Sequence, residues 1–540
     1  MLGSLLAPVR ESVFVVRTLV GNGMIGPERP DRLVRGLDAL RRWGPTTAGG
    51  YEAAAIRRGD AIGLVDERGT LTFGELNERS NRLAHGLRAA GVGPGDGVAL
   101  LCRNHRWFVE ATVAIAKLGA HALYLNTMFA APQITEVCER EGPVAIIHDE
   151  EFTTFVAPAA EGRLRYVAWQ DAPDPDGALS LDDIARGRPA SAPPVPAEPG
   201  RVVILTSGTT GAPKGAQRAQ PGSLAPVAAI FDAIPLRAGE RTLISAPLFH
   251  SWGMAHFLLA ISLGSAIVLR RRFDPQDALR TAAEQRATAL AVVPVMLQRI
   301  LELPDDVLER YDTRALRVIA VSGSALPGDL STRVMDRFGD VLYNLYGSTE
   351  VAWATIASPA DMRAAPGTAG RPPHGTIVRL FDAGGAPVLT PGATGRIFVG
   401  NEMAFEGYTG GGGKQVIDGL MATGDVGHLD AAGRLFIDGR DDEMIVSGGE
   451  NVFPREVEDL LADHPGVLEA AVLGVPDEDW GQRLRAFVVA APGGVKEQAL
   501  KDYVKANLAS FKVPRDVVFL DELPRNPTGK VLKRVLAERD

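Results

Sequence analysis

The sequence is poor in cysteine and carries no excess of positive charge. Only two of its 540 residues are cysteines, Cys102 and Cys138, and neither belongs to a Cys-x-x-Cys pair. Disulfide and zinc frameworks are therefore not expected, and a reducing cytoplasm is the predicted compartment. The formal net charge of −9 gives no electrostatic reason to expect a nucleic-acid partner.

The sequence also lacks an uninterrupted apolar run long enough to cross a membrane. Near its start, apolar residues recur at helical spacing, but Arg10, Glu11 and Arg17 interrupt them. No basic segment precedes this stretch and no small-residue cleavage site follows it, so a signal peptide is not expected. Two interpretations of residues 1–20 stay open: a helix docked on the protein's own surface, or a helix lying on a membrane. The apolar stripe consists of Leu2, Leu5, Leu6, Val9, Val13, Val16 and Val20.

The chain does contain a long alternation of strand-like and helix-like segments. Thr72-Phe73-Gly74-Glu75 resembles a capping box that opens a helix with the apolar stripe Leu76, Leu83 and Leu87. Such alternation predicts an α/β fold with mostly parallel sheets flanked by helices. The expected strands are 61–65, 70–73, 98–101, 144–148, 202–205, 243–246, 289–293 and 318–322.

Two segments resemble boundaries. Residues 172–200 are rich in proline, alanine and aspartate, and a second break lies near 439–442. Beyond that break the pattern of a short helix, two strands and another helix predicts a small α+β domain. We therefore expect an N-terminal helical extension over 1–50, a large domain over 51–441 and a small C-terminal domain over 442–540.

A loop rich in glycine and hydroxyl side chains follows the expected strand 202–205. Residues 205–215 read Leu-Thr-Ser-Gly-Thr-Thr-Gly-Ala-Pro-Lys-Gly, which offers backbone N–H groups, hydroxyls and one lysine to phosphate oxygens. The spacing of a Walker loop is absent. A flexible connector has the same composition, so composition alone leaves the two interpretations open.

This loop and five later motifs resemble, in order, the motifs of the adenylate-forming superfamily, and the chain most resembles its fatty acyl-CoA synthetases. The resemblance extends from about residue 50 to the end. It implies that the chain activates a medium- or long-chain fatty acid as its acyl-adenylate and passes it to coenzyme A. The five later motifs are Tyr346-Gly347-Ser348-Thr349-Glu350, Thr423-Gly424-Asp425, Gly439-Arg440-Asp441-Asp442, Ser447-Gly448-Gly449-Glu450-Asn451 and Asn526-Pro527-Thr528-Gly529-Lys530.

The resemblance also assigns roles to residues. Tyr346 is expected against adenine, Asp425 at the ribose hydroxyls, and Thr349 and Glu350 at the phosphates. Because a carboxylate beside polyphosphate needs a cation between them, Mg²⁺ is the expected cofactor, with Thr210 and Glu350 as ligands. The expected ATP-binding residues are Thr206, Ser207, Gly208, Thr209, Thr210, Lys214, Gly323, Ser324, Ala325, Tyr346, Gly347, Ser348, Asp425 and Arg440.

Lys530 is the expected catalytic cation, because attack of a carboxylate on the α-phosphate brings two anions together. Ser447, Gly448 and Gly449 are expected near the thiol of coenzyme A, although they share the small domain with Lys530. One rigid arrangement would not place both groups at the same reaction centre. The resemblance implies that the small domain rotates between the two half-reactions, about a hinge at Asp442.

The acyl pocket is expected at Phe249, His250 and Trp252, with His250 beside the reacting carboxylate. A histidine among aromatic residues is equally often a packing residue, so that alternative stays open. No acidic or amide residue stands in position to pair an amino acid's ammonium group, which favours an aliphatic tail. Two rival functions remain: a ligase that loads a carrier protein, and a nucleotide-binding regulator without turnover. The sequence does not distinguish a monomer from a homodimer.

Overall fold

We describe the protein from a computed structural model. The structure describes residues 2–26, 29–171, 177–206, 214–218, 223–403, 405–408, 413–443, 445–447, 450–477, 481–527 and 529–539. Contacts divide the chain into two units, residues 1–321 with 402–413 and residues 322–401 with 414–540. The boundary expected after residue 441 stays a prediction.

One sheet of the first unit has the order β18-β9-β8-β4-β3-β5-β6-β7. From β8 to β7 all neighbouring strands are parallel, whereas β9 runs antiparallel to both β8 and β18. The strands are β3 (Gly97–Leu101), β4 (His121–Tyr124), β5 (Ala145–His148), β6 (Leu164–Val167), β7 (Leu179–Ser180), β8 (Val202–Thr206), β9 (Lys214–Arg218) and β18 (Phe405–Tyr408).

The other sheet of this unit has the order β13-β12-β10-β11-β1-β2. Its strands pair in parallel except for the hairpin of β1 and β2. The mostly parallel sheets predicted from the alternation are therefore confirmed. The strands are β1 (Ile62–Asp66), β2 (Gly69–Thr72), β10 (Arg241–Ile244), β11 (Ala266–Leu269), β12 (Ala289–Val292) and β13 (Val318–Val321).

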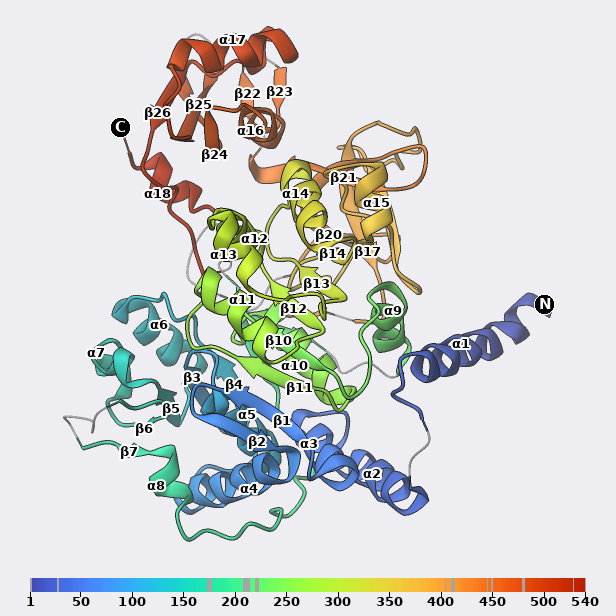
Figure 1. Ribbon diagram of the computed structural model, residues 1–540, viewed down its shortest axis with the longest axis vertical. Helices are drawn as coiled ribbons and strands as arrows, with labels where there is room; N and C mark the ends of the chain where they lie inside the picture. Colours follow the sequence, from blue (N-terminus) through green and yellow to red (C-terminus); the bar gives the residue numbers. More distant parts are fainter. Residues whose placement is uncertain are drawn as a thin grey trace. The chain divides into compact units, whose positions relative to one another are not determined.

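Helices pack on both sheets, and α4 and α5 share one core with strands of each (Figure 1). The predicted capping box opens α4: the Thr72 hydroxyl accepts from Glu75 N at 3.1 Å, and Thr72 N donates to the Glu75 carboxylate at 2.8 Å. The predicted stripe Leu76, Leu83 and Leu87 is buried. The helices are α1 (Leu2–Gly21), α2 (Pro30–Trp43), α3 (Thr47–Arg58), α4 (Phe73–Ala89), α5 (Arg106–Leu118), α6 (Ala131–Glu141), α7 (Thr153–Val156), α8 (Leu181–Ala185), α9 (Ala225–Ala233), α10 (Ser251–Ser262), α11 (Pro275–Glu284), α12 (Pro294–Leu301) and α13 (Asp305–Arg310).

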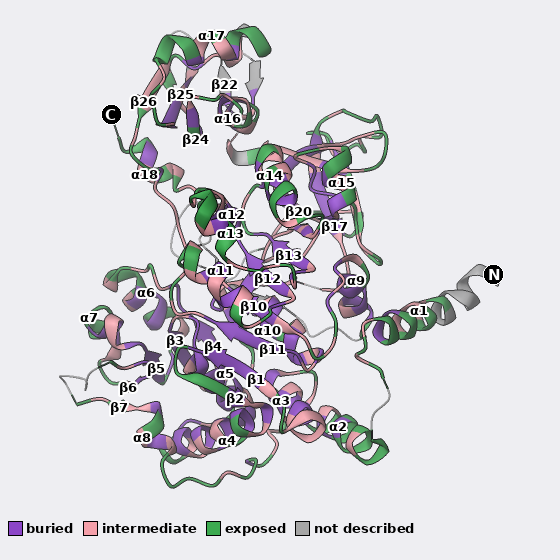
Figure 2. Cartoon of the chain, viewed as in Figure 1, coloured by how far each residue is buried: buried purple, intermediate pink, exposed green. Residues whose placement is uncertain are grey.

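Helix α1 contacts the rest of its unit through its last turns. Thr18 and Leu19 are buried, and α1 packs against α9. Three valines of the predicted stripe lie outside this contact, since Val13, Val16 and Val20 are 60%, 54% and 52% exposed. Most strands of the unit are buried, whereas many residues in the described part of α1 are exposed (Figure 2). Among the described helices, none combines the length and the apolarity needed to cross a membrane.

The second unit contains one antiparallel sheet, one mixed sheet and the hairpin of β14 (Leu342–Tyr346) with β15 (Thr355–Ala357). One sheet has the order β16-β17-β20-β19 with β21 beside β20, and the other has the order β23-β22-β25-β24 with β26 beside β25. The strands are β16 (Ile377–Phe381), β17 (Gly395–Gly400), β19 (Val416–Ile417), β20 (Leu420–Leu429), β21 (Leu435–Arg440), β22 (Ile445–Ser447), β23 (Glu450–Val452), β24 (Val467–Asp477), β25 (Gly481–Ala490) and β26 (Asp516–Phe519).

The last of these sheets forms the small C-terminal α+β fold that the sequence predicts. Residues of β22, β24, β25 and two helices share one core there. Among its described strands, β25 and β26 pair in parallel and the other pairs are antiparallel, whereas most strand pairs of the first unit are parallel. The helices of the second unit are α14 (Gly328–Phe338), α15 (Pro359–Ala364), α16 (Pro454–Ala462), α17 (Glu497–Asn507) and α18 (Lys533–Ala537).

Candidate active site

The predicted phosphate-binding loop connects two antiparallel strands. Thr206 ends β8 and lies opposite Lys214, the first residue of β9. Val203 and Leu205 of β8 are buried, so the loop follows a buried strand as the sequence indicates. The expected ligands Ser207, Gly208, Thr209 and Thr210 lie outside the described residues.

Three expected nucleotide-binding residues lie together in the second unit. The Tyr346 hydroxyl, at the end of β14, donates to Asp425 Oδ2 at 2.6 Å. Asp425 Oδ1 faces Arg440 Nε at 3.4 Å, and the two residues are register partners on β20 and β21. A carboxylate held from two sides is pre-oriented to accept hydrogen bonds from a diol.

Asp425 follows a glycine that the local backbone requires. Gly424 has φ +88°, a conformation that residues with a side chain rarely adopt. The hydroxyl of Thr423 accepts from Asp425 N at 3.0 Å and donates to the carbonyl of Ile397 at 3.1 Å. The motif Thr-Gly-Asp is therefore a strand segment in which each residue helps to aim the carboxylate.

Burial and charge act in opposite directions on Asp425. Loss of water raises the pKa of its carboxyl above the ordinary value, although the Tyr346 hydroxyl and the charges of Arg440, Lys530 and Lys414 lower it. Burial, together with the charge of Asp425, raises the pKa of Tyr346 well above its ordinary value. Tyr346 therefore stays a neutral hydrogen-bond donor, and positive charge from Lys530 acts at the carboxylate expected to meet ribose.

The loop that carries Thr349 and Glu350 joins β14 to β15. A Cβ at Gly347 would lie 2.3 Å from the carbonyl oxygen of Ala352, so only glycine fits there. The Ser348 hydroxyl accepts from Glu350 N at 3.2 Å. Asn401, which sequence reasoning missed, donates to the carbonyls of Val351 and Trp353 at 2.8 and 3.0 Å. This loop is therefore braced from outside by one amide.

The backbone shows where the predicted adenine-binding turn and the predicted hinge residue lie. Gly323, Ser324 and Ala325 form the turn before α14, where Gly323 has φ +98°. Asp442, the expected hinge, lies in the short 3-10 segment Asp441–Glu443. Both placements suit the predicted roles, which stay predictions.

Lys530 lies in a tight turn of the C-terminal α+β fold. Its backbone N donates to Asn526 Oδ1 at 2.9 Å, and Asn526 N donates to the Lys530 carbonyl at 2.9 Å. Gly529 has φ +78°, and Arg525 ties this turn to Glu469 at 2.9 Å. The lysine backbone is therefore fixed while its side chain is half-buried.

The expected thiol-binding motif begins at the end of β22. Ser447 is the register partner of Glu450 on β23 and of Gly481 on β25. Gly448 and Gly449 lie outside the described residues. The predicted role of this motif in the second half-reaction is untested by these positions.

The predicted acyl-pocket residues lie at the carboxyl ends of β10 and β12. Phe249 and His250 follow β10, and Trp252 Nε1 donates to the carbonyl of Val292, the last residue of β12, at 2.9 Å. His250 Nε2 is buried and has no hydrogen-bond partner in the described chain. Burial lowers the pKa of His250 to about 4, so its imidazole is neutral near pH 7.

Asn104 holds this segment in place, and sequence reasoning missed it. Its amide nitrogen donates to the carbonyls of Ile244 and Ala246 at 3.3 and 2.9 Å, and its oxygen accepts from Leu248 N at 2.8 Å. Asn104 follows β3, so it joins the two sheets of the first unit. The bonds join residues 140 to 144 positions apart in sequence, so no local pattern predicts them.

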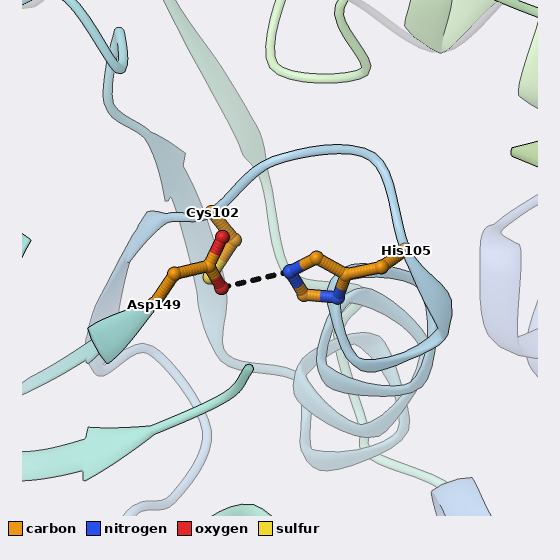
Figure 3. Close-up of side chains that lie close together, drawn as sticks. All are labelled: Cys102, His105 and Asp149. Atoms are coloured by element: carbon orange, nitrogen blue, oxygen red, sulfur yellow. Dashed lines mark hydrogen bonds and ion pairs between the residues drawn. The ribbon is translucent and has the colours of Figure 1, made fainter. Parts of the chain in front are cut away.

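Cys102, His105 and Asp149 form a buried cluster in the first unit (Figure 3). His105 Nε2 lies 2.7 Å from Asp149, and its Nδ1 accepts from Phe108 N at the start of α5, at 3.4 Å. Burial raises the pKa of the Cys102 thiol well above its ordinary value, and Cys102 Sγ donates to the carbonyl of Ile147. Because both ring nitrogens are used and the thiol is protonated, the cluster fits a structural network better than a metal site.

Known proteins place these residues in a family. Residues 51–409 match the family described as AMP-binding enzyme, and residues 456–530 match its C-terminal domain. A feruloyl-CoA synthase of an Amycolatopsis species is 35% identical over 499 residues, which cover 90% of this chain and 96% of that protein.

Other relatives carry other names. The fatty acid–[acyl-carrier-protein] ligase ScoC of Streptomyces coeruleorubidus is 32% identical, over 88% of this chain and 93% of that protein. The long-chain-fatty-acid–CoA ligase FadD13 of Mycobacterium tuberculosis is 31% identical, over 87% and 93%.

A solved structure agrees with the fold. The o-succinylbenzoate CoA synthetase MenE of Bacillus subtilis, in complex with an acyl-adenylate intermediate, superposes with a TM-score of 0.78 at 28% identity. The match covers 91% of this chain and 98% of that one. The chain belongs to the AMP-binding enzyme family, the adenylate-forming superfamily, and to its acyl-CoA synthetase type.

Proposed function

We propose that the chain joins a medium- or long-chain fatty acid to coenzyme A in two steps. In the first step a carboxylate oxygen bonds to the α-phosphorus of ATP and pyrophosphate leaves. In the second step the thiol sulfur bonds to the acyl carbon, AMP leaves, and the thiol proton passes to solvent. The observation that carries the proposal is the carboxylate of Asp425, held between Tyr346 and Arg440.

The geometry at Asp425 suits a ribose. A carboxylate accepts hydrogen bonds from two neighbouring hydroxyls, and its partners fix its orientation before the nucleotide arrives. Arg440 also supplies positive charge beside it. Tyr346, with its hydroxyl engaged, leaves its ring available to lie along a base.

Lys530 supplies the positive charge that the first step requires. Negative charge increases on the phosphate oxygens as the carboxylate attacks, and an ammonium group there lowers the barrier. The influence of Lys530 on the pKa of Asp425 supports a role near the nucleotide. Its fixed backbone turn limits the entropy lost when the side chain engages the phosphate.

Glu350 fits the predicted Mg²⁺ site by its chemistry, because magnesium prefers oxygen ligands and usually takes one or two carboxylates with phosphate oxygens. The second predicted ligand, Thr210, lies outside the described residues. When bound, Mg²⁺ would neutralise charge on the phosphate oxygens. The braced loop would hold Glu350 at a defined distance from them.

An apolar acid is supported by the residues at the carboxyl ends of β10 and β12. Leu248, Phe249 and Trp252 are buried there, and no acidic side chain of this segment is present to pair an ammonium group. The similarity to a fatty-acid–CoA ligase supports a fatty acid, and the similarity to ScoC keeps a carrier protein as the rival acceptor.

Product analysis tests the proposal. Purified protein with ATP, Mg²⁺, coenzyme A and straight-chain acids of increasing length should consume coenzyme A and release AMP in equal amounts. Acyl transfer to a carrier protein, without consumption of coenzyme A, would favour the rival acceptor. Nucleotide binding without pyrophosphate release for any acid would favour a regulator without turnover and would contradict the proposed enzymatic activity.

We also propose that α1 rests on a membrane surface, so that the protein is cytoplasmic but peripheral. Val13, Val16 and Val20 lie on one exposed stripe, with Arg10 and Arg17 on the same helix. Such a helix buries apolar side chains at the lipid boundary while its cations meet anionic headgroups. Flotation with anionic vesicles should be lost in a chain starting at Gly21, and equal flotation of both chains would contradict the proposal.

A further inference from the structure

Helix α10 contains a second buried histidine whose ring is not hydrogen-bonded. His256 is 1% exposed, and neither of its nitrogens has a partner in the part of the chain that the structure describes. A neutral imidazole has one donor and one acceptor. Leaving such a group buried and unpaired is unfavourable, so an unpaired histidine indicates an external partner.

The surroundings of His256 locate it in the fold. Its ring meets the ring of Trp252 edge-on, with centroids 4.5 Å apart, and Trp252 is hydrogen-bonded to the last residue of β12. On the same helix, Gly253 approaches the segment after β10 so closely that a Cβ would lie 2.2 Å from the Pro247 carbonyl oxygen. This face of α10 therefore lies against the carboxyl ends of β10 and β12.

The gap between β10 and β12 is the point where the strand order of this sheet reverses. From β10 the chain passes to β11 on one side and then returns to β12 on the other side. In open α/β sheets, ligands bind outside the carboxyl ends of strands at such a point. His256 and the unpaired Nε2 of His250 both belong to the segment that covers it.

The protonation state of these histidines limits which chemical groups could bind them. Burial lowers the pKa of His256 to about 4, as it does for His250, so both rings are neutral near pH 7. A neutral ring forms no ion pair, so it would not recognise the second carboxylate of a dicarboxylic acid. It pairs well with a hydroxyl, which can both donate and accept.

We infer that His256 hydrogen-bonds a hydroxyl group on the body of the acid, so that the preferred substrates are hydroxylated acids with an otherwise apolar skeleton. The inference rests on the proposed function, because it places the tail of the acid at the carboxyl ends of β10 and β12. It makes His256 a specificity-determining residue. The reacting carboxylate and the nucleotide do not depend on it.

Matched pairs of acids test the inference. The pairs are decanoate with 10-hydroxydecanoate, hexadecanoate with 16-hydroxyhexadecanoate, and cinnamate with 4-hydroxycinnamate, and the readout is kcat/KM for pyrophosphate release. In at least one pair the wild type should favour the hydroxylated acid about tenfold, the effect of one buried hydrogen bond. His256→Leu should lose that preference and keep activity on the plain acid, whereas His256→Gln should retain part of it.

The control is His85→Leu, which removes a half-buried histidine of α4 and should leave the preference unchanged. If His256→Leu does not fold, His256→Phe, which also lacks a hydrogen-bonding group, replaces it in the same comparison. A wild type that favours no hydroxylated acid, or a His256→Leu variant that keeps the preference, overturns the inference. Absence of pyrophosphate release with every acid overturns the proposed function instead.

Discussion

At the scale of single residues, the site depends on opposite charges brought into one small volume. Asp425 is the clearest case, because burial disfavours its charge while three cations and a tyrosine hydroxyl favour it. The cations and the hydroxyl therefore offset part of the effect of burial on the pKa of this carboxyl, and such opposing effects are common at functional sites.

Lys530→Ala should reduce acyl-adenylate formation about 100- to 1,000-fold, because it removes the cation that we propose offsets charge on the phosphate. Thioester formation from supplied acyl-adenylate should remain near the wild-type rate. Each half-reaction is measured separately by quenched single turnover. Lys505→Ala, which removes an exposed lysine of α17, is the matched control. Equal loss of both half-reactions in Lys530→Ala would contradict the assigned role.

Asp425→Asn should raise KM for ATP about tenfold or more, because the acceptor that we propose for the ribose hydroxyls is weakened. The same substitution should stabilise the folded protein even though it weakens ATP binding. The folded-state pKa of Asp425 is raised, so its contribution to stability is present at low pH and is lost as pH rises through that pKa. Removing the charge should therefore raise the melting temperature at pH 7. A variant with lower stability and unchanged ATP binding would contradict both statements.

His256 predicts a stability change with pH. Its folded-state pKa of about 4 is below the ordinary value of 6.5, so its contribution is present above about pH 6.5 and is lost as pH falls toward 4. Between pH 7 and pH 5 this loss amounts to about 2 kcal/mol. Thermal unfolding of His256→Leu should therefore show a smaller decrease over this range than the wild type. An identical decrease would show that the ring is not buried in its neutral form.

At the scale of elements, loops are positioned by amides far away in sequence. Asn104 holds the segment after β10, and Asn401 holds the loop after β14. Asn104 bonds backbone groups of Ala246 and Leu248, and Asn401 bonds those of Val351 and Trp353, all of which lie outside the strands and helices. These amides give the two loops defined shapes without regular structure.

Asn401→Ala should lower kcat/KM for ATP about tenfold, because two carbonyls of the loop that carries Glu350 lose their donor. Steady-state pyrophosphate release measures the effect. Asn507→Ala is the matched control, since it removes an amide that donates to the Tyr503 carbonyl on α17. A loss no larger than that of the control would mean that the brace is dispensable.

Sequence patterns predicted the positions of helices and strands better than they predicted which distant segments pair with them. The expected strands and the capping box lie within about two residues of their places in the structure, because periodicity and caps are local. Residues 172–200 look like a boundary, yet β7 and α8 fall within them and β7 pairs with β6. Composition indicated a linker there, whereas pairing with a distant strand decided the structure.

At the scale of the whole molecule, the order of motifs was the informative signal. It predicted the family, and three of the residues that it assigned to a nucleotide site, Tyr346, Asp425 and Arg440, lie together. Nothing in the sequence predicted Asn104, Asn401 or the unpaired ring of His256, since each depends on contacts between segments far apart in the chain. The identity of the acid likewise depends on contacts between distant segments, so the sequence did not predict it.

The most direct test of the account is whether the protein makes an acyl-adenylate at all. Wild-type protein in excess is mixed with ATP, Mg²⁺ and an acid in the absence of coenzyme A, and the quenched mixture is analysed for the mixed anhydride and pyrophosphate. Both products should appear in equal amounts, and coenzyme A added afterwards should convert the anhydride into a thioester. Bound ATP that stays intact with every acid supplied would contradict it.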